Sequence, residues 1–428
     1  MVSKSSKLLQ GLLFYSYAGA IYIRYLIVLS VNLLLAGIPF FPKIDRSQYE
    51  KELFEEDGEY GHHRYIEVSE GKKFHIVETG DSNGPLILFL HGFPQFWYTW
   101  RNQLKGLRNE GYHIVAMDMV RVSVRYKYTL YSLKTQVIFS TATPPSPQRG
   151  YGGSYTPSSL SEYKSKILVS DVRSMIRALV APTLHSRAAA LVGHDWGGII
   201  AQQVAHDSWL RDQARTADDD AQVDSGYIDK LVVINVPHPE VIGRNIARPL
   251  EHHLNIGTLV SLMTSPRATW ARIWPELAPI FRQLRMSHYI FMFGLPSPLP
   301  ELACTMGDQY FFQKALKYTA PKDRPNPEAI ERYKAQFYGV KGRKRLTAAI
   351  AYYKIAATSD RIGVIGYPTL FLWGEDDIAL QSSLCLDGVE LFYPHVTVTR
   401  LPGVNHFVPE EEPEIVNEAL RQFVMGKQ

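Results

Sequence analysis

Short apolar runs alternate with helical stretches along most of this chain. Leu86–Leu90, His113–Met119 and Ala188–Val192 have the length of strands and contain few polar residues. A strand of this kind is buried on both faces, as in a parallel sheet that helices cover on each side. Helical stretches such as Trp196–His206 follow the runs. The alternation predicts an α/β fold with a mostly parallel sheet.

The same alternation defines the predicted units. The other expected strands and helices are Tyr65–Val68, Lys73–Glu78, Lys230–Asn235, Pro368–Trp373, Val396–Leu401, Phe96–Asn109 and Glu414–Val424. Trp209–Gly226 is polar and predicts a surface loop. Residues 240–345 are rich in helix formers, aromatic residues and prolines, without a strand pattern. We therefore expect a helical cap, residues 240–345, inserted after the sixth strand between core segments 60–239 and 346–428.

The first 42 residues have a different character. Leu8 to Phe41 contains a single charged residue, Arg24. A helix needs about 20 apolar residues to cross a membrane, and Gly11–Ile38 is long enough. A cleaved signal peptide fits less well, because the apolar region is too long for one. We expect residues 1–42 to be a single-pass transmembrane anchor, with the endoplasmic reticulum as its membrane.

Composition excludes several classes of protein. The net charge is only +4 over 428 residues, and the one dense basic run is Lys341–Arg345. A nucleic-acid binder would concentrate more positive charge on one face. The two cysteines, Cys304 and Cys385, cannot form a disulfide framework, and their spacing indicates no metal site. We expect no nucleic-acid partner, no metal and no cofactor.

The stretch Gly193–Gly197 carries the sharpest chemical signal. It reads Gly-His-Asp-Trp-Gly between a buried strand and a helix, which is the pattern of a strained turn that exposes a nucleophile. The nucleophile position holds Asp195. Serine attacking a saturated carbon would leave a stable ether, whereas a carboxylate leaves an ester that water can cleave. Asp195 therefore indicates attack on a carbon with a strained or good leaving group.

An acid and a base follow in the expected order. Asp377 ends an acidic turn after the Pro368–Trp373 strand, with Asp376 as its nearest rival, and His406 follows Val396–Leu401. The order nucleophile, acid, histidine is that of hydrolases built on such a sheet. The backbone N–H groups of Phe93 and Trp196 are the expected oxyanion donors.

Three stretches together resemble one family. They are His91–Arg101, Gly193–Gly198 and Val233–Pro239, and they are similar to the epoxide hydrolases of the α/β-hydrolase superfamily. The apolar N-terminus resembles the membrane-anchored subgroup that includes epoxide hydrolase 4. The resemblance implies the α/β-hydrolase fold and hydrolysis of an epoxide to a diol by water. The aromatic cap and the anchor favour an apolar, fatty-acid-derived epoxide.

The resemblance also implies two cap tyrosines that hold the epoxide oxygen. Tyr289, ahead of a Gly-Leu-Pro stretch, matches one position, and Tyr353 matches the other, with Tyr352 as its nearest rival. The chain departs from the family pattern in two places. Lys354 and Ile355 replace the usual Arg-Asn after the second tyrosine, and Phe407 replaces the usual Trp after the base.

Two other functions use parts of the same pattern. A haloalkane dehalogenase has the same nucleophile and base but binds halide with N–H donors, for which Trp196, Trp270 and Trp274 are candidates. A catalytically silent anchored protein with this fold would bind a lipid or a protein partner. Intact Asp195, Asp377 and His406 argue against the silent protein.

Residues Val120–Gln148 interrupt the family pattern. The resembling enzymes carry Asp-x-Arg-Gly-Tyr-Gly after the fourth strand, and here Asp118-Met119 and Arg149-Gly-Tyr-Gly flank the interruption. The segment begins with Val, whose codons begin with GT, and ends with Gln, one of whose codons is CAG. An unspliced intron lying between codons would begin with GT and end with AG, so we interpret the segment as a retained intron. A genuine loop insertion is the alternative, since surface loops tolerate length well.

We expect the dominant spliced transcript to lack the codons for Val120–Gln148, which transcript sequencing would show. A dominant message that retains them would contradict the intron interpretation. So would a shortened protein with lower stability and activity than the full chain.

Overall fold

The computed structural model describes residues 16, 19–25, 27, 48–54, 57–69, 71–119, 160–214, 225–253, 255–321, 325–355 and 361–427. Most of the predicted anchor, residues 1–42, and all of the predicted insertion, Val120–Gln148, lie outside the described residues. In the part of the chain that is described, no helix is both long and apolar enough to cross a membrane.

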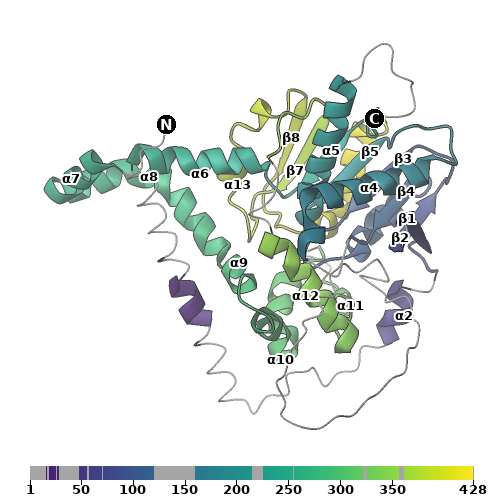
Figure 1. Cartoon of the computed structure of the whole chain (residues 1–428), viewed down its shortest axis with the longest axis horizontal. Coiled ribbons are helices and arrows are strands. Elements are labelled where there is room, and N and C mark those ends of the chain that lie inside the picture. Colours follow the sequence, from purple (N-terminus) through teal and green to yellow (C-terminus); the bar gives the residue numbers. More distant parts are fainter. Residues whose placement is uncertain are drawn as a thin grey trace, which may run out of the picture.

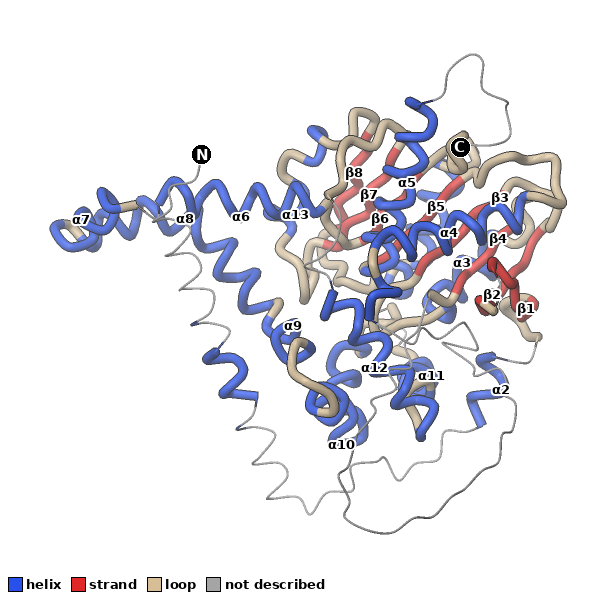
Figure 2. Tube along the Cα trace, in the orientation of Figure 1, coloured by secondary structure: helices blue, strands red, loops and turns tan. Residues whose placement is uncertain are grey.

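One eight-stranded sheet forms the centre of the molecule (Figure 2). Its strands are β1 (His62–Ser69), β2 (Lys72–Gly80), β3 (Leu86–Leu90), β4 (His113–Met117), β5 (Ala190–His194), β6 (Leu231–Ile234), β7 (Thr369–Gly374) and β8 (Val396–Leu401). They lie in the order β1-β2-β4-β3-β5-β6-β7-β8. β2 is antiparallel to both neighbours, and the pairs from β4 to β8 are parallel. The predicted mostly parallel α/β sheet is confirmed.

Helices cover both faces of the sheet, as the apolar strands require. Helices α4 (Ser165–Val180) and α5 (Trp196–Ala214) lie on one face, where they pack on Leu86, Leu88 and Leu90 of β3. Helices α3 (Arg101–Leu107) and α15 (Pro413–Phe423) lie on the other, against Ile87 and Phe89. Successive residues of β3 thus point to opposite faces, because side chains alternate along a strand. Burial on both sides fixes the register of the central strands.

The cap follows β6 and, in its described residues, consists of helices joined by loops. Its helices are α6 (Pro239–His253), α7 (Ile256–Thr264), α8 (Pro266–Met286), α9 (His288–Phe293), α10 (Leu299–Leu316), α11 (Pro327–Ala335) and α12 (Gly339–Ile355). In Figure 1, α6, α7 and α8 form an arm that projects to one side, whereas α9 to α12 gather below the sheet. A small apolar cluster of α6, α8 and α13 (Ser382–Leu386) holds the base of the arm to the core.

Two predicted boundaries differ from the structure. Helix α12 runs unbroken across the predicted end of the cap at residue 345. Trp209–Gly226 is not a loop throughout, because α5 continues to Ala214. The sequence there is polar on the exposed side, but Ser208 and Asp212 bond with Tyr367, so tertiary contacts extend the helix.

The described N-terminal residues contact the cap. Residues 19–25 are helical. The Tyr22 ring meets Phe291 edge-on at 6.3 Å between centroids, and Tyr25 stacks on His288 at 6.1 Å. Both partners belong to α9, so this N-terminal segment lies beside the helix that continues from α8.

Candidate active site

The turn between β5 and α5 presents Asp195. This residue has a φ of 52°, a left-handed conformation that is costly for a residue with a side chain. A Cβ on Gly193 would lie 2.5 Å from the Gly197 carbonyl oxygen, and one on Gly197 would lie 2.2 Å from the Leu90 oxygen. Only glycine fits at these close approaches. The glycine pattern in the sequence therefore marks the tight turn that was predicted.

The loop after β3 approaches the nucleophile from the side. The Phe93 N–H donates to Oδ1 of Asp195 at 2.8 Å. A Cβ on Gly92 would lie 2.4 Å from the Asp195 Cβ, so glycine allows this approach. The structure places Phe93 where the sequence predicted an oxyanion donor. Trp196 directly follows Asp195 at the start of α5, and its role as second donor stays a prediction.

His406 lies between two carboxylates. Its Nδ1 is 2.7 Å from Oδ2 of Asp377, and its Nε2 is 3.6 Å from Oδ2 of Asp195. Asp377 follows β7 and His406 follows β8, and both are buried. The rival Asp376 is exposed. The structure thus brings together the predicted nucleophile, acid and base, with Asp377 as the acid.

Asn235 orients the acid and was missed as a site residue by the sequence argument. It follows β6 with a φ of 43°. Its Nδ2 donates to Oδ2 of Asp377 at 2.7 Å, and its Oδ1 accepts from the Gly374 N–H at 2.9 Å. The backbone N–H groups of Ala379 and Leu380 bond the other carboxylate oxygen. Donors to both oxygens of this buried carboxyl group fix its direction.

His194 supports the loop of the base. Its Nε2 lies 2.8 Å from the His406 carbonyl oxygen and its Nδ1 lies 2.9 Å from Oε1 of Gln95. Burial, with the nearby His406 charge, lowers the pKa of His194 to about 4. Gln95 in turn donates to Glu410 at 2.6 Å. The sequence did not predict this role for His194, because its hydrogen-bond partners belong to distant segments of the chain.

Glu410 joins the site to the cap. It forms a buried ion pair with Arg101 and accepts from the Tyr333 hydroxyl of α11 at 2.8 Å. Arg101 also donates to the Thr319 carbonyl at 3.3 Å. Removing one partner of such a buried pair typically costs about 3–5 kcal/mol, because the other charge stays buried. The stretch His91–Arg101 therefore fastens the oxyanion loop, the cap and the His406 loop together.

The two predicted tyrosines meet above the nucleophile. Tyr289 comes from α9 and Tyr353 from α12, with ring centroids 5.9 Å apart. Burial raises the pKa of both phenols, and the negative charge of Asp195 raises each further. Both hydroxyls therefore stay protonated near Asp195. The rival Tyr352 packs on Tyr163 at 5.2 Å, in the apolar cluster on the other side of the helix.

The charges at the site are coupled. Burial opposes a charged imidazole, but Asp377 and Asp195 outweigh it and raise the pKa of His406 to about 10. Burial likewise opposes ionisation of Asp195, but the facing His406 lowers the pKa of this carboxyl below its ordinary value. At neutral pH the resting site holds an imidazolium between two carboxylates.

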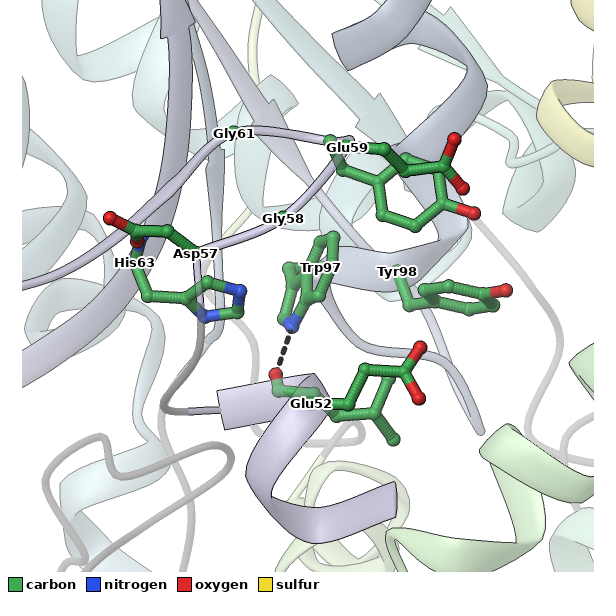
Figure 3. A pocket seen from close by; sticks show the side chains of 10 residues that line it. Glu52, Asp57, Gly58, Glu59, Gly61, His63, Trp97 and Tyr98 are labelled. Carbon is green, nitrogen blue, oxygen red and sulfur yellow. Dashed lines mark hydrogen bonds between the residues drawn. The ribbon is translucent and has the colours of Figure 1, made fainter. Parts of the chain in front are cut away.

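Two other features lie apart from these residues. In the described part of the chain, the one group of side chains that could hold a metal ion is His252, His253 and Glu276, on α6 and α8 of the arm. A cavity of about 130 Å³ lies between α2 (Gln48–Phe54), the following loop and Trp97 (Figure 3). Trp97 Nε1 donates to the Leu53 carbonyl there at 2.7 Å. Neither feature includes a predicted catalytic residue.

Comparison with known proteins agrees with this geometry. The model of the Alpha/beta hydrolase family matches residues 87–419. The chain belongs to this family. The match spans β3 to α15 and so includes the nucleophile turn, the acid and the base, which confirms the predicted fold.

Named relatives of this alpha/beta hydrolase are epoxide hydrolases. The chain is 29% identical to epoxide hydrolase 3 of Xenopus tropicalis, over 85% of this chain and 78% of the relative. It is 26% identical to epoxide hydrolase 4 of Mus musculus, over 86% and 81%. Its fold is similar to an epoxide hydrolase of Bacillus megaterium in complex with an inhibitor, with a TM-score of 0.55, 24% identity and coverage of 85% and 100%. The resemblance predicted from the motifs is confirmed.

Replacing Asp195 with Asn should lower the pKa of His406, because the imidazolium then faces one carboxylate instead of two. NMR titration of ring-labelled histidines would measure this shift from about 10. Asp376→Asn is the matched control, since it removes an exposed charge from the neighbouring acidic turn. A His406 pKa that is equal in both variants would show that the two groups are not coupled.

Proposed function

We propose that this alpha/beta hydrolase converts epoxides to vicinal diols through a covalent ester on Asp195. The observation that carries the proposal is a largely buried carboxylate at the nucleophile turn, close enough to two protonated cap tyrosines for its charge to raise their pKa values. A carboxylate can open a strained ring only if the leaving oxygen receives hydrogen bonds as charge develops. The names of the relatives support the same activity.

The first step is ring opening. Asp195 attacks one epoxide carbon, the bond from that carbon to oxygen breaks, and the oxygen gains the bonding electrons. Tyr289 and Tyr353 donate hydrogen bonds to this oxygen, and one of them transfers its proton. The product is a hydroxyalkyl ester on Asp195.

The second step is hydrolysis of the ester. Esterification removes the charge of Asp195, so the pKa of His406 falls. The imidazolium then releases a proton, which restores the tyrosine hydroxyl, and the neutral imidazole can act as a base. His406 takes a proton from water while Asp377 holds the imidazole in direction. The water oxygen attacks the ester carbonyl, whose oxygen is stabilised by the Phe93 N–H and, as predicted, by that of Trp196. When this intermediate collapses, the bond from the carbonyl carbon to the alkyl oxygen breaks. The leaving oxygen takes the remaining proton of the attacking water, which gives the diol and an ionised Asp195, with His406 protonated again.

The structure disfavours halide binding. Trp270 and Trp274 are 45% and 42% exposed on α8, so neither offers a buried indole donor beside Asp195. The Trp196 side chain is hydrogen-bonded with Tyr353. An assay of one recombinant sample with a lipid epoxide and a haloalkane would separate the two activities from a catalytically silent protein.

The surroundings of the nucleophile support an apolar epoxide as the substrate. The Phe93 ring contacts Phe293, Phe312 and Tyr353, at centroid distances of 5.2, 6.1 and 5.3 Å. Such a wall gives apolar contact area and few polar partners for a substrate. Fatty-acid-derived epoxides have this chemistry.

Membrane attachment through residues 1–42, at the endoplasmic reticulum, is a further proposal that rests on the apolar sequence alone. Deleting residues 1–42 should release an active enzyme from carbonate-washed membranes, because no predicted catalytic residue lies there. Immunoblots of the pellet and supernatant would measure the release. A released protein that is folded but inactive would contradict the proposal that residues 1–42 attach the enzyme to the membrane and take no part in catalysis.

Replacing His406 with Gln should trap the ester, because ring opening does not need the base. Mass spectrometry of the epoxide-treated protein should show a substrate adduct on the peptide that contains Asp195. Asp195→Asn in the same background is the control and should carry no adduct. An adduct elsewhere, or continued turnover without His406, would refute the mechanism.

Tyr353→Phe should slow ring opening by about a hundredfold, the typical effect of removing one donor to a developing oxyanion. Rapid-quench measurement of ester formation would give the rate constant. Tyr352→Phe is the matched control and should have a small effect, since Tyr352 packs on Tyr163. A larger effect of Tyr352→Phe would mean that the register of α12 is wrong.

A further inference from the structure

One side of helix α8 exposes large aromatic side chains. Trp270, Trp274 and Phe281 are 45%, 42% and 50% exposed. They stack in sequence, with centroid distances of 5.4 Å from Trp270 to Trp274 and 5.6 Å from Trp274 to Phe281. Their spacing places them on one side of the helix. The adjacent side of α8 is already buried against α6 and α13 through Ile273, Leu277 and Ile280.

Basic residues accompany this aromatic face. Arg267 precedes Trp270 by one helical turn, and Arg285 follows Phe281 by one turn. Arg272 and Arg282 are also exposed on α8. The single acid of the helix, Glu276, contacts His253 at 3.0 Å. Aromatic residues between exposed arginines are the composition of a helix that lies in a membrane interface.

The exposed apolar surface continues to the tip of the arm. Met263 and Val260 of α7 are 85% and 53% exposed. Figure 1 shows α7 at the end of the arm, away from the sheet. A protruding tip of this kind can enter a lipid interface without moving the hydrolase core.

We propose that the arm is a membrane-binding surface, in which the aromatic face of α8 and the tip of α7 rest on an anionic phospholipid bilayer. The four arginines of α8 outnumber its single acid, and this positive charge complements anionic headgroups. A second copy of the chain is a poor occupant, because a two-fold contact through this face would oppose arginine to arginine. The surface is independent of the proposed reaction.

The N-terminal segment adds to this argument. Tyr22 and Tyr25 contact α9, which directly continues α8. Residues 19–25 and the aromatic face thus lie along consecutive helices of the cap. Tyr289 lies on the same short α9, so a bilayer bound at the arm also lies next to the helix that carries one predicted substrate contact.

The test uses the full chain with one fluorescent label on the arm. Both native cysteines are buried, so Met263→Cys provides a selective site for a polarity-sensitive dye. Leu184→Cys is the matched control, because Leu184 is fully exposed in the loop before β5, at the edge of the sheet opposite the active site. Each protein is mixed with or reconstituted into phosphatidylcholine–phosphatidylserine vesicles that contain a lipid-borne quencher.

We expect several-fold stronger quenching and a blue shift at position 263 compared with position 184. The change Trp270→Ser/Trp274→Ser/Phe281→Ser should remove most of this difference, as should omission of phosphatidylserine. Circular dichroism and epoxide turnover check that the triple variant still folds. Equal quenching at both positions would overturn the proposal. A dye at position 263 that is already shielded from water without vesicles would also overturn the proposal. Analytical sedimentation would then show whether a second copy of the chain or a segment of the same chain covers this position.

Discussion

The position of His406 between Asp377 and Asp195 is the interaction on which the rest of the site depends. His406 and Asp377 are buried and Asp195 is largely buried, so the charged imidazole and the Asp195 carboxylate stabilise each other strongly. Asp377 and Asp195 raise the pKa of His406, so the imidazole is charged at rest. In the reaction that we propose, esterification of Asp195 removes one of these negative charges, and the same coupling then sets the order of the two chemical steps.

A second buried group, Glu410, connects this site to the rest of the fold. Glu410 contacts Arg101, Gln95 and Tyr333, and Gln95 leads through His194 to the backbone of His406. The oxyanion loop, the base and the cap are therefore held by one network of polar contacts. Because the surrounding interior is apolar, each polar group of this network needs the others as hydrogen-bond partners.

The cap divides into two parts with different surroundings. Helices α9 and α12 carry Tyr289 and Tyr353, the predicted substrate contacts, and aromatic neighbours partly bury both rings. The arm of α6, α7 and α8 instead leaves its aromatic residues exposed. Sequence composition alone does not distinguish the aromatic residues of these two parts. Their separation into substrate-facing and outward-facing sets depends on how the helices pack.

The sequence by itself determined the fold class and the order of Asp195, Asp377 and His406, because apolar periodicity and the glycines of a tight turn are local signals. Only the tertiary structure decided between Asp377 and Asp376 and between Tyr353 and Tyr352, since neighbouring residues differ in the face they present and not in their chemistry. It also showed the roles of Asn235 and His194, and it placed Trp270 and Trp274 outside the site. These contacts join segments far apart along the chain, and no local pattern encodes such distances.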